Sequence, residues 1–133
     1  MSTESNRALI ERMFAGMAVG DSRLLVDSMA EDFRWTVTGR TPWSKTYEGK
    51  AAVLGELFAA LQTRIEGRIK TIPDRIMADG DQVVVEAHGD NRTREGVPYN
   101  NHYCFVFELA DGRLKTVTEY FDSEMVTAVL GAA

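Results

Sequence analysis

The sequence contains little cysteine and no long apolar run. Cys104 is the single cysteine, so no internal disulfide can form, and an intracellular location is expected. No apolar stretch approaches the roughly 20 residues that a membrane-spanning helix needs. The first seven residues, Met-Ser-Thr-Glu-Ser-Asn-Arg, lack the basic and apolar regions of a signal peptide. We therefore expect a cytoplasmic protein with no membrane partner.

Positive charge is also scarce. The chain has 15 Lys and Arg residues against 20 Asp and Glu residues, which gives a net charge of -5. Nucleic-acid binding needs a basic face, so no nucleic-acid partner is expected. The sequence also lacks a glycine-rich phosphate loop and any recognised spacing of metal ligands, and we expect neither a cofactor nor a metal. A hydrophobic content of 44% over 133 residues predicts one globular domain spanning residues 1–133.

Hydrophobic periodicity divides the chain into an early helical part and a later strand-rich part. Apolar residues recur at helical spacing in residues 5–18, 22–29 and 50–64, and a short helix is expected at 123–130. Residues 34–38 and 68–78 are predicted strands, and 38–48 a loop. Three further strands are predicted in QVVVEAHGDNRT, YNNHYCFVFEL and RLKTVTEYFD, which are short, rich in Val, Phe, Tyr and Thr, and separated by turn signals.

This order of elements predicts the α+β class. Helices that precede a run of antiparallel strands are typical of a sheet with helices on one face. Long strands twist and curl. We therefore expect a curled antiparallel sheet whose three N-terminal helices close a cone-shaped pocket.

The layout, with the segments YEGKAAV, YNNHY, FELADGRL and EYFDS, resembles the nuclear transport factor 2-like superfamily in its SnoaL-like and ketosteroid-isomerase-like branch. The resemblance covers nearly the whole chain and implies a cystatin-like fold, a pocket for an apolar small molecule and frequent homodimers. Members include isomerases, cyclases, hydrolases and non-catalytic binders, so the fold alone does not give the activity.

Comparison with limonene-epoxide-hydrolase-like proteins implies positions for the site. The first acid of their final strand, a catalytic carboxylate, corresponds to Glu119. Their catalytic Arg and Asp correspond to Glu86 and His88, and their water-positioning Tyr and Asn to Trp35 and Val37. The position of the catalytic base in ketosteroid isomerase, an enzyme known for the tuned pKa values of its carboxyl groups, falls near Arg40. No carboxylate stands there. The resemblance implies the location of a pocket floor and not the hydrolase or isomerase residues themselves.

Side chains alternate along a strand, so Glu86 and His88 share one face while Val83 and Val85 share the other. Alternation alone allows either face to be the inner one. The family comparison favours the face that carries Glu86, together with Asn101 and Glu119. Two carboxylates in one apolar pocket cannot both ionise cheaply, and one should have a raised pKa.

We accordingly expect catalytic roles for Glu119, Glu86 and His88 in general acid-base chemistry. The alternative is that the glutamates lie on a solvated sheet face or form an ion pair with Arg34, Arg40 or Lys115. A second group is expected to contact the ligand, with Trp43 either a lid over the pocket or packed down. Its members are Trp35, Asn101, Tyr103, Phe121 and Trp43.

Two functions remain open from the sequence. One is a cofactor-independent isomerase, cyclase or hydrolase acting on a small apolar molecule, and the other is a non-catalytic binding or scaffold module. A homodimer through the outer sheet face is also expected, because an apolar patch would otherwise be exposed. The residues assigned to that patch are Val83, Val85, Cys104, Val106 and Leu114.

Overall fold

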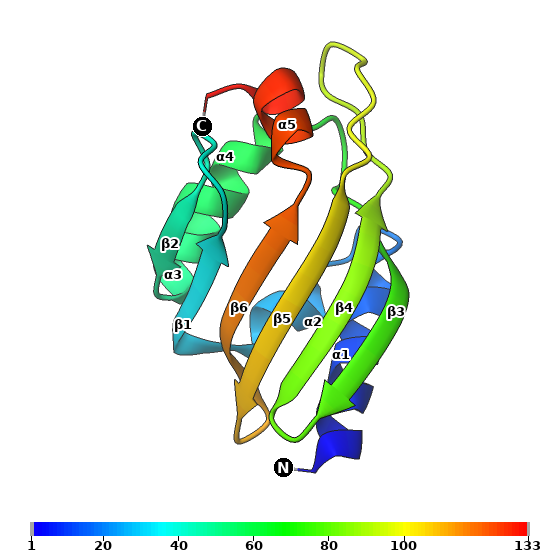
Figure 1. Ribbon diagram of the computed structural model, residues 1–133, viewed down its shortest axis with the longest axis vertical. Coiled ribbons are helices and arrows are strands. Elements are labelled where there is room, and N and C mark those ends of the chain that lie inside the picture. Colours follow the sequence, from blue (N-terminus) through cyan, green and yellow to red (C-terminus); the bar gives the residue numbers. More distant parts are fainter. Residues whose placement is uncertain (1, 133) are drawn as a thin grey trace.

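The computed structural model describes residues 2–132, in which helices cover one face of a curled six-stranded sheet (Figure 1). The strands lie side by side in the order β2-β1-β6-β5-β4-β3. Their bounds are β1 Met29–Val37, β2 Lys45–Glu48, β3 Thr71–Asp79, β4 Gln82–Gly89, β5 His102–Ala110 and β6 Arg113–Phe121. The predicted α+β class, with a curled sheet and N-terminal helices, is confirmed.

The helices lie behind the sheet and at one end of it (Figure 1). Helix α1 packs against β3 and β4, and its first turn is held by a capping box between Ser2 and Ser5. Within residues 2–132 no helix is long and apolar enough to cross a membrane. The helical bounds are α1 Thr3–Met17, α2 Arg23–Ser28, the continuous run α3 Lys50–Ala52, η1 Val53–Phe58 and α4 Ala59–Gln62, and the C-terminal run α5 Ser123–Met125 and η2 Val126–Leu130.

The sheet is mixed, which corrects the expectation of an antiparallel one. Strand β1 pairs with β6 in parallel, while the other neighbouring pairs are antiparallel. The edge strand β2 was expected to be loop. Its four residues are mostly polar and exposed, and only Tyr47 is buried, so the segment is too short for alternation to reveal it.

The inner face of β4 is the apolar one, so the predicted orientation of this strand is wrong. Val83, Val85 and Ala87 are buried, whereas Glu86 and His88 point away from the helices. Burying the wholly apolar set avoids taking a carboxylate and an imidazole out of water. The alternation itself is as expected, since residues two positions apart along β4 lie on the same face of the sheet.

The proposed dimer patch is smaller than expected for the same reason. Val83, Val85 and Leu114 are fully buried in the core and cannot contribute to an outer surface. Cys104 and Val106 do lie on the outer face, opposite Glu86 and Val84 of β4. The dimer stays a prediction.

Candidate functional site

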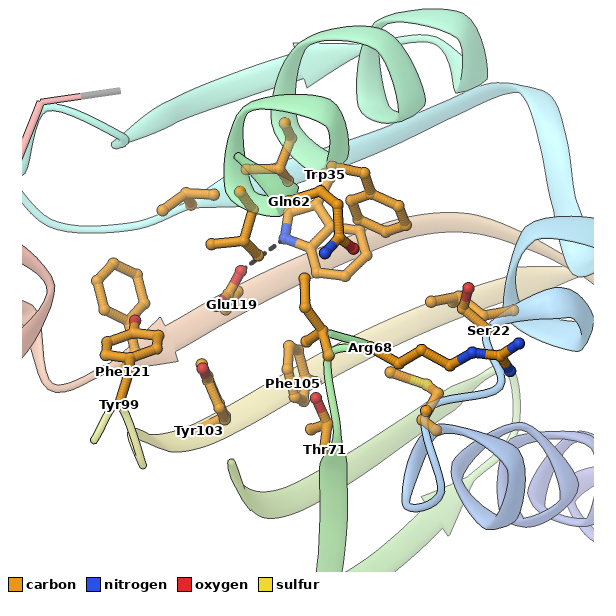
Figure 2. Close-up of a pocket in the computed structure, with 18 of the residues that line it drawn as sticks. Ser22, Trp35, Gln62, Arg68, Thr71, Tyr99, Tyr103, Phe105, Glu119 and Phe121 are labelled. Carbon is orange, nitrogen blue, oxygen red and sulfur yellow. Dashed lines mark hydrogen bonds between the residues drawn. The ribbon is translucent and has the colours of Figure 1, made fainter. Parts of the chain in front are cut away.

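A cavity lies between the inner face of the sheet and the helices. Its volume is about 610 Å³, within the range of ligand pockets in proteins. Most of its wall is apolar and comes from β1, β5, β6, the helical run 50–62 and the C-terminal segment. Figure 2 shows the few polar groups that interrupt this wall.

Strand pairing places Glu119 in the middle of an apolar row. On the inner face it lies between Phe105 of β5 and Val37 of β1, and Val85 extends the row on β4. Its flanking inward neighbours on β6 are Val117 and Phe121. The sequence therefore directs one carboxyl group into an otherwise apolar part of the cavity.

The Glu119 carboxyl has one hydrogen bond from another side chain. The indole N–H of Trp35 donates to Oε1 over 2.8 Å, and the two groups point toward one another in Figure 2. Burial raises the pKa of Glu119 from 4.5 to about 7, and the Trp35 hydrogen bond opposes that rise. Near neutral pH the group therefore exists in comparable amounts as acid and as base, which suits proton transfer in either direction.

Two tyrosines line the same end of the cavity. The pKa of Tyr103 is well above its usual value, mainly because the side chain is buried. The neighbouring Tyr99 and Glu119 raise it further. Burial also raises the pKa of Tyr99. Both phenols therefore remain protonated and can donate a hydrogen bond to a ligand oxygen. The Tyr103 ring stacks on Phe105 at a centroid distance of 5.2 Å, which fixes its direction.

Four of the five expected contact residues line the cavity. These are Trp35, Trp43, Tyr103 and Phe121, and Glu119 lines it as well. The placement of these side chains is thus as expected, and their roles remain predictions.

Glu86 and His88 do not reach the cavity, and their expected placement is wrong. Glu86 Oε1 pairs with Nη2 of Arg75 at 2.9 Å on the outer face. His88 Nδ1 lies 2.9 Å from Asp74, also outside. Both pairs join β3 to β4 across the exposed side of the sheet. The alternative of an ion pair is therefore observed for Glu86, but its partner is Arg75 of β3 and not Arg34, Arg40 or Lys115.

Asn101 is buried but serves the backbone instead of the cavity. Its Oδ1 accepts from the N–H groups of His102 and Asp122 at 2.7 and 2.9 Å, and its Nδ2 donates to the Asp122 carbonyl and to the Tyr99 hydroxyl at 3.1 Å each. These bonds tie the start of β5 to the end of β6. Its expected ligand contact is not supported by this geometry, because each polar atom already has two partners.

Trp43 lines the cavity but is packed down. Its side chain is 3% exposed, and its indole N–H donates to the Gly131 carbonyl over 2.9 Å. Tyr47 Oη donates to the Trp43 carbonyl over 3.0 Å. Trp43 therefore fixes the C-terminal segment over the cavity, and of the two alternatives the packed one is observed.

Sequence reasoning missed the polar residues at the other side of the cavity. Ser22, Arg68 and Thr71 all line it. They belong to a turn before α2, a connecting segment and the start of β3, and no motif links them. Among the described residues, no group of three or more His, Cys, Asp or Glu side chains is arranged to hold a metal ion.

Comparisons with known proteins agree with the fold. An NTF2-like protein from Burkholderia xenovorans is 26% identical, with 97% of this chain and 98% of that chain covered and a TM-score of 0.76. A putative isomerase from Bacillus subtilis is 21% identical, with coverage of 100% and 98% and a TM-score of 0.79. A putative SnoaL-like polyketide cyclase from a Jannaschia species is 18% identical, with coverage of 98% and 94% and a TM-score of 0.79.

No curated protein matches the chain. A family model, described as the SnoaL-like domain, matches residues 10–117. This match includes β1 to β5 and the start of β6, and it ends before Glu119. Because the match spans most of the sequence, the protein belongs to the SnoaL-like domain family.

Proposed function

We propose that the protein binds a small, largely apolar molecule in this cavity and transfers a proton on it, with Glu119 as the acid-base group. The observation that carries the proposal is a carboxyl group in an apolar cavity whose pKa is raised to about 7. A group that titrates near neutral pH can both accept and return a proton efficiently. Similar structures named as a putative polyketide cyclase and a putative isomerase are consistent with such chemistry.

The roles follow from the geometry. Ionised Glu119 removes a proton from a carbon next to a carbonyl group, and the electron pair moves onto the carbonyl oxygen. The hydroxyls of Tyr103 and Tyr99 are the available donors for that oxygen as its charge grows. Trp35 holds Oε1 of Glu119, and Oε2 is the oxygen that we assign to the proton transfer. Return of the proton to a different atom completes an isomerisation, with no external cofactor.

A non-catalytic binder is the second candidate. Protonated Glu119 can donate a hydrogen bond, so the same cavity can recognise a ligand carbonyl without reaction. The indole of Trp35 and the two tyrosine hydroxyls support recognition equally well. The two candidates differ in whether a proton leaves carbon.

Hydrogen–deuterium exchange separates them without a known substrate. A panel of small cyclic and aryl ketones is incubated with the protein in D₂O, and loss of the C–H signal next to the carbonyl is followed by proton NMR. The wild type should accelerate exchange of at least one ketone, and Glu119→Gln should lose that acceleration. Glu86→Gln is the matched control, because it removes a strand glutamate that lies outside the cavity.

Each outcome decides between the candidates. Acceleration that survives in Glu119→Gln contradicts the assigned acid-base role. Ketones that bind with no exchange in the wild type favour the non-catalytic binder. Loss of exchange in Glu86→Gln as well would point to a general disturbance of the sheet and contradict the specific role of Glu119.

We also propose that two copies associate through the outer sheet face. Met77 is 45% exposed and Tyr120 is 51% exposed there, and Val84 and Val106 lie between them. Pairing would cover these groups. Light scattering at micromolar concentration should give twice the chain mass, with Val106→Lys shifting it toward the monomer. A monomeric wild type would contradict the proposal.

A further inference from the structure

A buried asparagine stands between the two tyrosines of the cavity wall. Tyr99, Asn101 and Tyr103 occupy alternate positions of the chain where β5 begins. The two tyrosines line the cavity, and Figure 2 shows both at the end that holds Phe121. Asn101 is fully buried and lies outside the cavity wall. It can therefore act on a bound ligand only through a neighbouring side chain.

The backbone fixes the orientation of the Asn101 amide. Its Oδ1 lies 2.7 Å from the backbone nitrogen of His102 and 2.9 Å from that of Asp122. A backbone N–H only donates, so the atom that faces both groups is the amide oxygen. The amide nitrogen then faces the Asp122 carbonyl and the Tyr99 hydroxyl, at 3.1 Å from each oxygen. Exchanging the oxygen and the nitrogen would set donors against donors.

This orientation gives the Tyr99 hydroxyl a direction. The amide nitrogen carries two hydrogens and has no lone pair to offer, so it donates one hydrogen to the Asp122 carbonyl and one to Tyr99 Oη. The hydroxyl accepts there and keeps its own proton for another partner. Because the Tyr99 side chain is only 4% exposed, that partner is not bulk water. On the cavity side it is the neighbouring Tyr103 hydroxyl or an oxygen of a bound ligand.

Backbone hydrogen bonds also hold the segment that carries both side chains. The Tyr99 N–H donates to the Asn91 carbonyl over 2.9 Å. The Asn101 carbonyl accepts from the N–H of Gly89, the last residue of β4, also over 2.9 Å. The hydroxyl is thus anchored through its backbone and through its own oxygen. A donor held in this way needs little reordering when a ligand binds.

We propose that Asn101 is a positioning residue that makes the Tyr99 hydroxyl a one-way donor to the oxygen of a bound carbonyl compound. The inference rests on the proposed function, since it concerns the oxygen that gains charge when Glu119 removes the proton. An aspartate at this place would have the opposite effect. Its oxygen would accept the Tyr99 proton and turn it away from the cavity.

The test compares two probes that differ by one carbonyl oxygen. 1-Indanone carries the oxygen, and indane has the same rings without it. Binding of each is followed by proton NMR of the methyl groups of the protein. The ratio of the two affinities reports the donors that meet the oxygen, because the apolar contacts of the rings are common to both probes.

The first variant reverses the polarity of the asparagine. Asn101→Asp should lower the indanone-to-indane affinity ratio about fivefold, as expected for the loss of one neutral hydrogen bond. Asn100→Asp is the matched control, since it makes the same change one residue away. The Asn100 residue is exposed and its Oδ1 accepts from the N–H of Asn91, which an aspartate oxygen can also do. This control should keep the wild-type ratio.

A second variant separates positioning from a merely structural role. Tyr99→Phe removes the hydroxyl and should lower the ratio about as much as Asn101→Asp does. The double variant should show no further loss, because the asparagine acts through that hydroxyl. Tyr99→Phe should also move one of the two side-chain amide proton signals of Asn101 upfield, because that N–H loses its acceptor.

Several results overturn the inference. An unchanged ratio in Asn101→Asp or in Tyr99→Phe does so, and so does a further loss in the double variant as large as that in Asn101→Asp alone. If Asn101→Asp does not fold, Tyr99→Phe still decides. In that variant an unchanged ratio, or unchanged Asn101 amide signals, is enough to refute the positioning role.

These measurements need no proton transfer, so they can fail separately from the proposed function. Ketone exchange that depends on Glu119, together with a ratio that is insensitive to Tyr99 and Asn101, removes this inference and keeps the proton transfer. No exchange, together with a ratio that falls in both single variants, keeps the positioning role and removes the proton transfer. Failure of both probes to bind at their highest soluble concentrations contradicts the positioning role and the apolar binding cavity together.

Discussion

Replacing Glu119 by Gln should change how the stability of the protein depends on pH. Glutamine keeps the size of the side chain and its ability to accept from Trp35, but it cannot ionise. The pKa of Glu119 is about 7 in the folded protein, against 4.5 for an unperturbed glutamate. Each unit of difference between the folded and unfolded pKa corresponds to about 1.4 kcal/mol. The free energy of unfolding of the wild type should therefore fall by about 3 kcal/mol through this group as the pH rises.

The direction follows from proton binding. Below about pH 4.5 Glu119 carries its proton in both the folded and the unfolded chain, so its ionisation does not reduce the free energy of unfolding. Between that pH and about 7 only the folded state retains the proton, so the free energy of unfolding falls as pH rises. Above about pH 7 both states are ionised and the dependence levels off. Glu119→Gln has no such loss.

Urea unfolding at a series of pH values measures this directly. The useful quantity is the difference in free energy of unfolding between Glu119→Gln and the wild type, because fixed packing effects of the substitution cancel in its pH dependence. That difference should increase by about 3 kcal/mol in favour of the variant between pH 4.5 and 8. Glu86→Gln, whose carboxylate is exposed and paired with Arg75, should show no comparable change. A difference that is constant with pH would refute the reasoning.

Three further substitutions test other contacts. Trp35→Phe removes the one side-chain donor to Glu119 found among residues 2–132, so the pKa of that carboxyl should rise further and the midpoint of the pH dependence should move up; a downward movement would contradict the assignment of the hydrogen bond. Asn101→Ala should cost about 3 kcal/mol in urea unfolding, because it leaves buried backbone groups, including those of Asp122, without partners; a cost near zero would show that water replaces the side chain. Phe14→Ala should cost about 4 kcal/mol by the same assay, because the ring is fully buried, and a cost below 1 kcal/mol would mean that the core collapses around the gap.

Periodicity predicted the elements well because most of them bury one clear face. The helices at both ends and the strands from β3 to β6 have apolar residues at the expected spacing. Strand β2 could not be found in this way. It has four residues with one buried side chain, and its existence depends on pairing with β1, which local sequence does not encode.

The buried face of β4 could not be chosen correctly from alternation and family resemblance. Both faces carry a valine, and the family resemblance favoured the one with Glu86. Desolvation gives the better criterion, since Val83, Val85 and Ala87 form a wholly apolar set and the other face includes a charge. For β6 the resemblance and the physics agree, because Glu119 lies between the inward Val117 and Phe121.

Arg68 and Thr71 illustrate what single-sequence reasoning does not reach. Neither belongs to a motif, and the distance along the chain from Ser22 is long. Both nevertheless line the cavity, because the fold brings a connecting segment and the start of β3 to its wall. Such a lining becomes visible only once the three-dimensional neighbours of each residue are known.

The central claim is that the carboxyl group in the cavity changes its charge near neutral pH. Carbon-13 NMR of labelled glutamate carboxyl groups measures this directly, with the Glu119 signal assigned by its loss in Glu119→Gln. A midpoint at about pH 7 is expected for this signal. A Glu119 signal whose midpoint lies near the unperturbed value of 4.5 would contradict it.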